Sequence, residues 1–267
     1  MPAALIHWSI FQFQSFVLVL MRVAPILFLM PVLSSSNLPN LLKMGLALTI
    51  SLILLPVVKL DPGLLPQEPY GFGFFLVTEL MIGLILGLTV KIIFASLQIG
   101  GELAGFQMGM MMANVVDPQS GVNAPVLSQF QYLLGLLLFL SIDGHHWFFR
   151  ALLHSFSILA PGELFVGAGL YRHLLELSGK MFTIAVQLAA PVMAVLLFTH
   201  IALGILAKAV PQVNILMTSF PLTISLGLLF LYFSVEILFP YFQTVIEGTC
   251  RGLVSTVLPL MQRVGNG

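Results

Sequence analysis

Charged residues are scarce in this chain, and that scarcity is the first constraint on what the protein can be. Only 7% of its 267 residues are Asp, Glu, Lys or Arg, whereas 59% are hydrophobic. Soluble domains carry about 25% charged residues, so this chain cannot cover a globule with polar surface. The sequence therefore predicts a protein that lies in a bilayer, or one that an assembly buries almost completely.

Cysteine and net charge are also nearly absent. A single cysteine, Cys250, excludes an internal disulfide framework and a cysteine metal cluster. A formal net charge of zero gives no indication of nucleic acid or of a polybasic contact with a membrane surface. The first residues lack the basic region and the small-residue cleavage site of a secretory signal. We therefore expect the first apolar helix to be retained.

Sequence patterns typical of enzymes are missing. The chain has no GxSxG nucleophile elbow, no HExxH zinc pattern and no GxxxxGK[ST] phosphate cradle. Asp143, His145, His146 and His154 invite a metal interpretation, but adjacent residues on a helix point about 100° apart and His146 and His154 are two turns apart. We therefore predict no enzyme activity, no cofactor and no metal, and interpret these histidines as a solvated cap at the membrane interface.

Long apolar runs take the place of these patterns. Several approach the ~20 residues that cross a bilayer, and their backbone groups must be satisfied internally, which requires helices. The sequence predicts an all-α, polytopic membrane-type protein with about six long hydrophobic helices arranged as helical hairpins. A shorter amphipathic or re-entrant helix is expected at 146–160, ending at Pro161-Gly162. The long runs lie at 10–33, 41–58, 71–98, 127–142, 180–207 and 215–239.

The stretch Gly100–Pro125 fits neither a membrane helix nor a solvated loop. It contains five glycines and four methionines, and a glycine inside a helix costs about 1 kcal/mol relative to alanine. We predict flexible backbone held inside protein, with the turn residues Asp117-Pro118-Gln119-Ser120-Gly121 folding it back. The soft methionine side chains suit a seal, but filling of an irregular core is the alternative.

Four ionisable residues interrupt the apolar runs, namely Arg22, Glu79, Lys91 and Glu236. A charge at membrane depth is costly and faces a partner, a cavity or the protein interior. A proton or ion relay is one interpretation. Pairing between helices, or exposure inside an assembly, is the other.

An ordered series of short motifs resembles the FliR family of flagellar export-apparatus proteins, whose injectisome relatives form the SpaR/YscT group. The resemblance runs from about residue 10 to about residue 255. The matching residues are Gly101-Glu102, Gly105-Phe106-Gln107-Met108-Gly109, Asp117-Pro118-Gln119-Ser120, Asp143-Gly144-His145-His146, Ser155-Phe156, Pro161-Gly162, Ala190-Pro191 and Pro211-Gln212-Val213-Asn214.

The resemblance implies that residues 1–267 form one subunit of a protein-export gate. This subunit would assemble with FliP and FliQ, and contact FlhB and FlhA, around a channel through which unfolded flagellar proteins leave the cytoplasm. The gate would lie in the bacterial inner membrane and flagellar basal body, partly above the bilayer plane. Residues 10–177 would form an N-terminal helical part, and 178–240 a FliQ-like helical hairpin.

The resemblance also implies a plug loop at 105–122 that closes the channel together with methionines of FliP. The implied gating side chains are Phe106, Met108, Met110, Met111 and Met112. Its hinge and turn residues are Gly105, Gly109, Asp117, Pro118 and Gly121. A partner-docking turn that faces the cytoplasm is implied at Pro211, Gln212 and Asn214. The alternatives are a small-solute secondary transporter of the inner membrane, and an assembly scaffold with no role in the pore.

Overall fold

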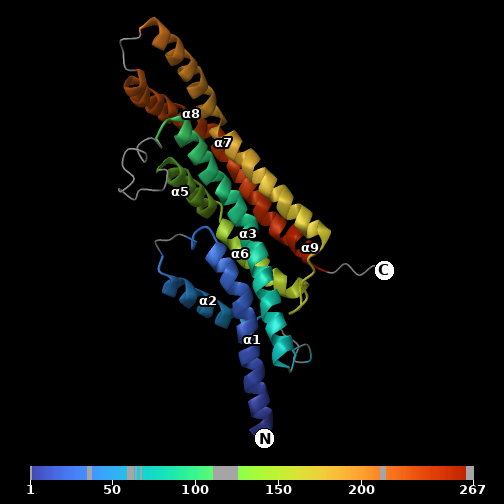
Figure 1. Ribbon diagram of the computed structural model, residues 1–267. Helices are drawn as coiled ribbons and strands as arrows, with labels where there is room; N and C mark the ends of the chain where they lie inside the picture. Colours follow the sequence, from blue (N-terminus) through green and yellow to red (C-terminus); the bar gives the residue numbers. More distant parts are fainter. Residues whose placement is uncertain are drawn as a thin grey trace. The chain divides into compact units, whose positions relative to one another are not determined.

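The structure, a computed structural model, consists of helices and connecting turns. It describes residues 2–34, 38–58, 63, 65–66, 68–110, 126–210 and 215–262. No strand occurs in these ranges, so the predicted all-α class is confirmed. In chain order the elements are α1 (Pro2–Leu29), α2 (Asn40–Leu54), α3 (Pro69–Gln107), α5 (Val126–Ser141), α6 (Gly144–Ile158), α7 (Ala168–Ala209), α8 (Ile215–Gly252), the π-helical turn η2 (Leu253–Val257) and α9 (Leu258–Met261) (Figure 1).

Four helical stretches in the described part of the chain are long and apolar enough to cross a membrane. They are Ile10–Leu29, Pro69–Gln107, Ala168–Ala209 and Ser219–Met261. The pair α5 and α6 passes the same test only together, and it is bent by 66° at its break. The polytopic membrane character is therefore confirmed, with four spans, or five if the bent pair is one span.

Two of the six apolar runs form helices that are too short to cross a bilayer on their own. The run at 41–58 yields α2, only 15 residues long, because Pro56 has no N–H with which to continue the helical ladder. The run at 127–142 ends at Ser141, and Asp143 then takes a left-handed conformation with φ of 55°. Asp is one of the few residues that tolerate this region. Helix α6 begins directly after it at Gly144, two residues before the start of the amphipathic or re-entrant helix expected at 146–160.

Helix α3 is longer than its apolar run. The run was expected to end near residue 98, but the helix continues through Gly100, Gly101 and Gly105 to Gln107. The expectation that this many glycines would break a helix is wrong for Gly100–Gln107. These glycines are needed for packing against another helix. A β-carbon on Gly101 would lie 2.5 Å from the Cα atom of Ser128, so only glycine lets α5 approach α3 this closely. Small residues at such crossings let membrane helices approach closely.

The chain divides into two compact units, each built from segments that are distant in sequence. Unit 1 comprises residues 1–91, 143–177 and 246–267, and unit 2 comprises 92–142 and 178–245. Helix α3 contributes its first part to unit 1 and its last part to unit 2. In unit 1, α1 packs on α2, and the backbone N–H of Phe165 donates to the carbonyl of Met261 in α9 (2.9 Å).

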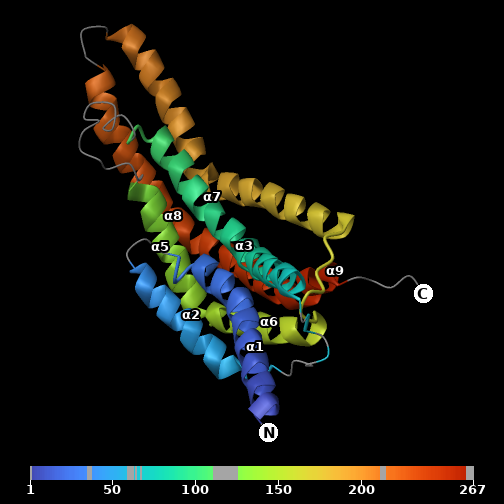
Figure 2. The same ribbon diagram turned by 60° about the horizontal axis from the view of Figure 1, so that its bottom comes forward.

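Unit 2 is a bundle of the end of α3, α5 and parts of α7 and α8. Its core cluster draws buried residues from all four helices: Ala104, Met108, Leu127, Ala189, Val192, Leu196 and Leu231. Phe94 is the centre of an aromatic group, with the rings of Tyr132, Phe139 and Phe242 placed edge-on at 5.5 to 6.2 Å. The Tyr241 hydroxyl donates to Oε1 of Gln187 (2.6 Å) and joins α8 to α7. Figure 2 shows α7 and α8 connected as a helical hairpin.

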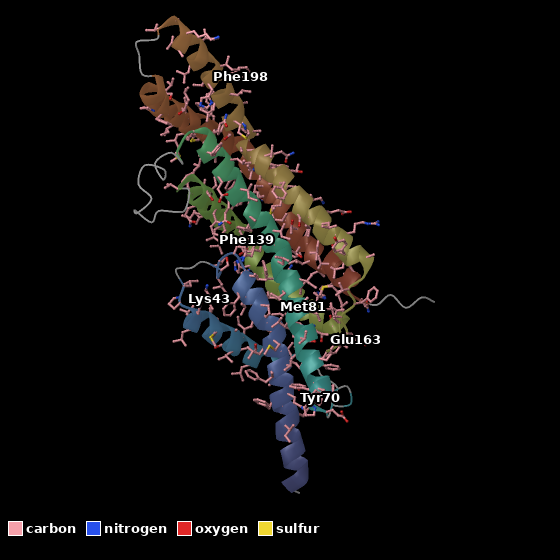
Figure 3. The ribbon with its side chains drawn as sticks, in the orientation of Figure 1. Lys43, Tyr70, Met81, Phe139, Glu163 and Phe198 are labelled. Atoms are coloured by element: carbon pink, nitrogen blue, oxygen red, sulfur yellow. The ribbon has the colours of Figure 1, made fainter. Side chains whose placement is uncertain are left out.

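Large apolar side chains cover the outside of the helices as well as the inside. Tyr70 on α3 and Phe198 on α7 are strongly exposed, and Figure 3 shows apolar side chains along the outer faces of the helices. A water-facing protein rarely exposes contiguous apolar surface of this kind. The exposed side chains therefore fit the membrane or an assembly, as the low charge content predicted.

Candidate functional site

The end of α3 is a well-formed helix cap. Gly109 has φ of +81°, a left-handed conformation that glycine adopts without steric cost. Its N–H donates to the carbonyl of Phe106, and the N–H of Met110 donates to the carbonyl of Gly105, both at 3.0 Å. This pair of bonds is the Schellman arrangement, which satisfies carbonyls at a helix end. The chain thus leaves α3 in a fixed direction at Gly109.

Met108 fastens this helix end to α8. Its side chain is fully buried in the core of unit 2, and its carbonyl accepts a hydrogen bond from Oγ1 of Thr223 (3.0 Å). A β-carbon on Gly227 would lie 2.6 Å from Met108 side-chain carbons, so the methionine lies directly on that glycine. Thr223 and Gly227 are one turn apart on α8 and therefore share a face. The end of α3 has both a polar and an apolar attachment there.

The beginning of α5 packs on the same end of α3. Gly101 lies against the backbone of Ser128, and the position of a β-carbon on Gly105 is 3.8 Å from the β-carbon of Leu127. Gly100 packs on Ala185 of α7, where a β-carbon would lie 3.1 Å from the carbonyl oxygen. The end of α3 and the start of α5, which are the described segments on either side of 111–125, therefore pack in a single bundle.

The predicted gating residues are not equivalent. Met108 points into the core of unit 2, so for this residue the core-filling alternative to a seal holds. Met110 is half-buried against the same cluster. Phe106, on the last turn of α3, is 68% exposed. Among the predicted hinges, Gly109 ends the helix and Gly105 lies within it. Other predicted residues lie outside the described ranges: Met111, Met112, Asp117, Pro118, Gly121, Pro211, Gln212 and Asn214.

Sequence reasoning missed the residues of α8 that receive Met108. Thr223 and Gly227 have the spacing of two small residues separated by three others, which is typical of close helix contacts in membranes. Phe220 belongs to the same surface, since a β-carbon on Gly109 would lie 2.9 Å from its ring. This spacing indicated a close helix contact, but it did not indicate that the contacting helix is α3.

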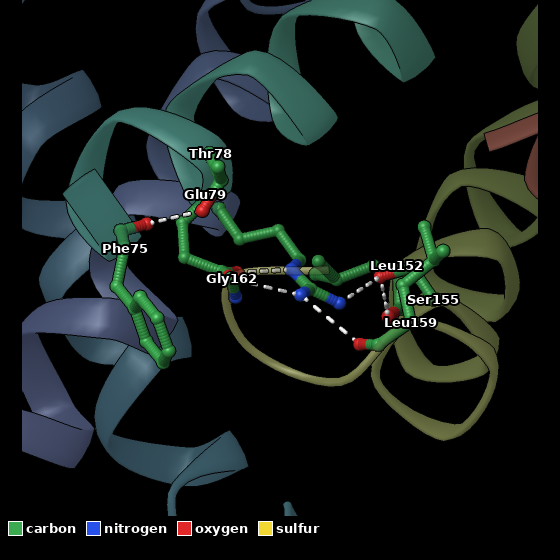
Figure 4. A network of polar contacts seen from close by, with 8 residues as sticks. Phe75, Thr78, Glu79, Leu152, Ser155, Leu159 and Gly162 are labelled. Carbon is green, nitrogen blue, oxygen red and sulfur yellow. Dashed lines mark hydrogen bonds and ion pairs between the residues drawn. The ribbon is translucent and has the colours of Figure 1, made fainter. Parts of the chain in front are cut away.

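Arg22 and Glu79 form a buried ion pair in unit 1, and both side chains are fully inaccessible. Figure 4 shows Glu79, Ser155, Leu159 and Gly162 of the polar cluster around this pair. Nε of Arg22 donates to Oε2 of Glu79, and Nη2 donates to Oε1 (2.9 Å). The guanidinium also donates to Oγ of Ser155 and to the carbonyl of Leu159, both at 3.2 Å. Of the two interpretations left open, this geometry is interhelical pairing, with the charges of α1 and α3 compensating each other.

The turn after α6 completes this polar cluster. The N–H of Gly162 donates to Oε1 of Glu79 (3.3 Å), and the ring of Phe156 lies 4.1 Å below the guanidinium carbon of Arg22. Gly162 has φ of +83° and its Cα faces the ring of Phe75, where a β-carbon would lie at 2.5 Å. The Pro161-Gly162 motif therefore places one more donor on the buried carboxylate.

Lys91 and Glu236, the other two ionisable residues of the apolar runs, are exposed. Neither forms an ion pair or hydrogen bond with any residue that the structure describes. Their charges therefore remain uncompensated within the described part of the chain.

Asp143, His145 and His146 lie close enough to share an ion, with one donor atom of each within 4.8 Å of the others. The sequence argument that adjacent histidines point apart does not hold at this bend, because the rings lie 4.2 Å apart. Nδ1 of His146 is 3.4 Å from Oδ1 of Asp143, and both side chains are largely exposed. Asp143 and His146 thus fit a solvated cap, whereas Nδ1 of His145 is buried and has no hydrogen-bond partner among the described residues.

Comparison with known proteins identifies the family of this chain. The model for bacterial export proteins, family 1, matches residues 13–249. The chain belongs to this family. It is 32% identical to the flagellar biosynthetic protein FliR of Bacillus subtilis (strain 168), over 95% of this chain and 96% of the relative.

Two further relatives have the same name. The flagellar biosynthetic protein FliR of Escherichia coli (strain K12) is 31% identical over 91% of this chain and 89% of its own. That of Borreliella burgdorferi is 33% identical over 82% of this chain and 81% of its own. The predicted relationship to the FliR family is confirmed, and with the apolar helices it makes the chain a membrane component of flagellar protein export.

Proposed function

We propose that this chain is a subunit of the flagellar type III export gate, which forms with FliP and FliQ the channel for unfolded flagellar proteins. Membership of the bacterial export family supports this role. In this proposal the protein is no enzyme and needs no cofactor, and it contacts FlhB and FlhA in the basal body of the inner membrane. Its C-terminal hairpin, 178–240, resembles FliQ, and the gate lies partly above the bilayer plane.

The segment 105–122 is the plug of this gate in our proposal. The observation that carries it is that the two described ends flanking 111–125, the capped end of α3 and the start of α5, pack together in one bundle. A seal must yield to chemically varied chains and still return to one place. Soft methionines between two fixed ends meet both needs. Energy for export would come from other components.

The complete burial of Met108 separates this residue from the other predicted gating residues. Met108 anchors the segment from inside the bundle, whereas Phe106 and Met110–Met112 are the side chains that would close the pore. Deletion of Met108–Met112 would remove the anchor together with the seal. We therefore distinguish the two by leaving Met108 intact.

The test replaces Met110, Met111 and Met112 with serine in the complete gate. The expected result is a clear rise in ion conductance of the closed complex in planar bilayers, because polar side chains no longer exclude water. The matched control replaces the exposed apolar residues Phe198, Ile201 and Ile205 of α7 with serine and should leave the closed gate tight. Unchanged conductance of the methionine variant would refute the plug and favour a scaffold without a pore role.

The turn between α7 and α8, which contains Pro211, Gln212 and Asn214, is proposed as a cytoplasm-facing docking turn. A photo-crosslinking amino acid at Gln212 should capture another export component in cells. Native mass spectrometry of the gently solubilised complex separates the gate from the transporter alternative. The gate predicts one copy of this chain with several small helical partners, whereas a transporter predicts a monomer or dimer.

A further inference from the structure

Two hollows lie next to each other in unit 2. Residues of α5 and α8 line both, and Leu97 of α3 and Leu188 of α7 also line the smaller one. The smaller has a volume of about 60 Å³ and the larger about 480 Å³. They share Leu134, Leu231 and Val235 in their walls, so they form one surface feature, which we name the α5–α8 groove. Aromatic side chains line its larger part, and Tyr232 there is 74% exposed. The groove is thus an open, apolar binding surface.

An unpaired hydrogen-bond acceptor lies in the smaller hollow. The side chain of Gln131 lines this hollow, and the residue is only 8% exposed. Its Oε1 atom is buried and has no hydrogen-bond partner. Buried polar atoms in folded proteins are almost always paired, so this acceptor requires a donor from a water molecule in the hollow or from another chain.

An unpaired negative charge lies beside the larger hollow. Glu236 is one of its lining residues, is exposed, and has no cation among the described residues. Its helix is strongly apolar, and acids within such helices pair with a cation or face water. Lipid tails could cover the apolar walls, but they supply neither a hydrogen-bond donor nor a positive charge.

We infer that the α5–α8 groove binds an apolar helix of another export-apparatus protein, and that this helix carries a lysine or arginine opposite Glu236. Charge complementarity selects the cation, and the apolar walls select a helix whose other side chains are aliphatic or aromatic. A donor on the same helix would satisfy Gln131. This inference rests on the proposed role as a subunit of an assembled gate and assigns one of its contacts to named residues.

Charge reversal in the complete gate tests the salt bridge. Glu236→Lys should lower recovery of the partner with the affinity-tagged full chain by about tenfold or more, because it sets two positive charges against each other. The matched control is Glu247→Gln on the same helix, whose carboxylate already pairs with Arg251 at 3.2 Å. This control should retain partner recovery.

Photo-crosslinking, followed by a compensating substitution in the partner, then identifies the helix that binds the α5–α8 groove. A photo-crosslinking amino acid at Tyr232 should capture a peptide from an apolar helix that contains lysine or arginine. Changing that basic residue to glutamate should restore recovery, and flagellar motility, in the Glu236→Lys background alone. Rescue by this exchange is the decisive positive result, since loss of folding in Glu236→Lys would not be repaired by a change in another protein.

Three outcomes would overturn the inference. They are a Tyr232 crosslink to lipid alone, a captured helix without a basic residue, and undiminished partner recovery by Glu236→Lys. In each of them a wild-type chain that still co-purifies with its partners leaves the export-gate proposal standing. If the wild-type chain co-purifies with no export component, the gate proposal itself fails.

Discussion

Units 1 and 2 join their helices by different chemistry. In unit 1 a buried charge pair, Arg22 and Glu79, links α1 and α3 and is completed by Ser155, Leu159 and Gly162 from α6 and its following turn. In unit 2 the end of α3 meets its neighbours through Gly100, Gly101 and the buried side chain of Met108. Polar geometry fixes the first contact, whereas shape alone fixes most of the second.

This difference bears on function. A buried ion pair with all its hydrogen bonds made has one good arrangement, because any shift leaves a charge uncompensated. Apolar packing on glycine is less directional, and methionine adapts to changes in shape. The unit that holds the ends of the proposed plug is therefore joined mainly by close packing and not by buried charge.

The largest effect should come from breaking the charge pair on one side. Glu79→Ala leaves the Arg22 charge buried without its partner, and this should lower the free energy of unfolding by about 3–5 kcal/mol. Urea titration of the full chain in detergent micelles, followed by the fluorescence of Trp8 and Trp147, which both belong to unit 1, measures the change. The double variant Arg22→Met with Glu79→Leu should recover most of the loss, since it leaves no buried charge. Equal losses in the single and double variants would show that shape, not charge, holds unit 1.

A somewhat smaller effect is expected for the anchor of unit 2. Met108→Ala removes a fully buried side chain and leaves a cavity against Gly227, which should cost about 2–5 kcal/mol. Helicity followed by circular dichroism during the same titration reports it. Met44→Ala, at an exposed methionine of α2, is the control and should change stability by less than about 0.5 kcal/mol. A Met108 variant as stable as the control would mean that this residue does not anchor α3.

The smallest effect is expected from adding a methyl group where α3 meets α5. Gly101→Ala places a β-carbon 2.5 Å from the backbone of Ser128, and such overpacking should cost about 1–3 kcal/mol. Gly45→Ala adds the same group to α2, where nothing lies within 4 Å. That control should be neutral or should stabilise its helix by up to about 1 kcal/mol. The same sign of change at both positions in the urea titration would contradict close packing at Gly101.

Much of the fold could be predicted from the sequence because its information is local. Apolar runs in an environment without water must form helices, and Pro161-Gly162 marks the end of α6 within a short distance of itself. Pro56 gives a similar local signal, which the predicted run 41–58 overlooked. The ordered motifs predicted the family, which the comparisons confirm. The gating roles of Phe106, Met110 and the methionines that follow stay predictions.

The errors came from positions whose environment is set by distant segments. Gly101 reads as a helix breaker until Ser128, 27 positions later in the chain, is brought against it. The methionine-rich sequence around Met108 is equally compatible with a side chain that lines a pore and with one that fills a core. Only the contact of Met108 with Gly227 shows that it fills the core. The spacing of Thr223 and Gly227 indicates a close helix contact but does not show which helix makes it.

The sequence by itself determined that this protein is helical, apolar and a member of the bacterial export family, because composition, periodicity and motif order are properties of the chain alone. Only the tertiary structure decided which charges compensate each other, where α3 ends and which methionine is an anchor. Those decisions depend on which helix faces get within a few ångströms of one another. Arg22 has its partner 57 positions later, and Glu236 has none in the described chain, yet in sequence both are simply charges in an apolar helix.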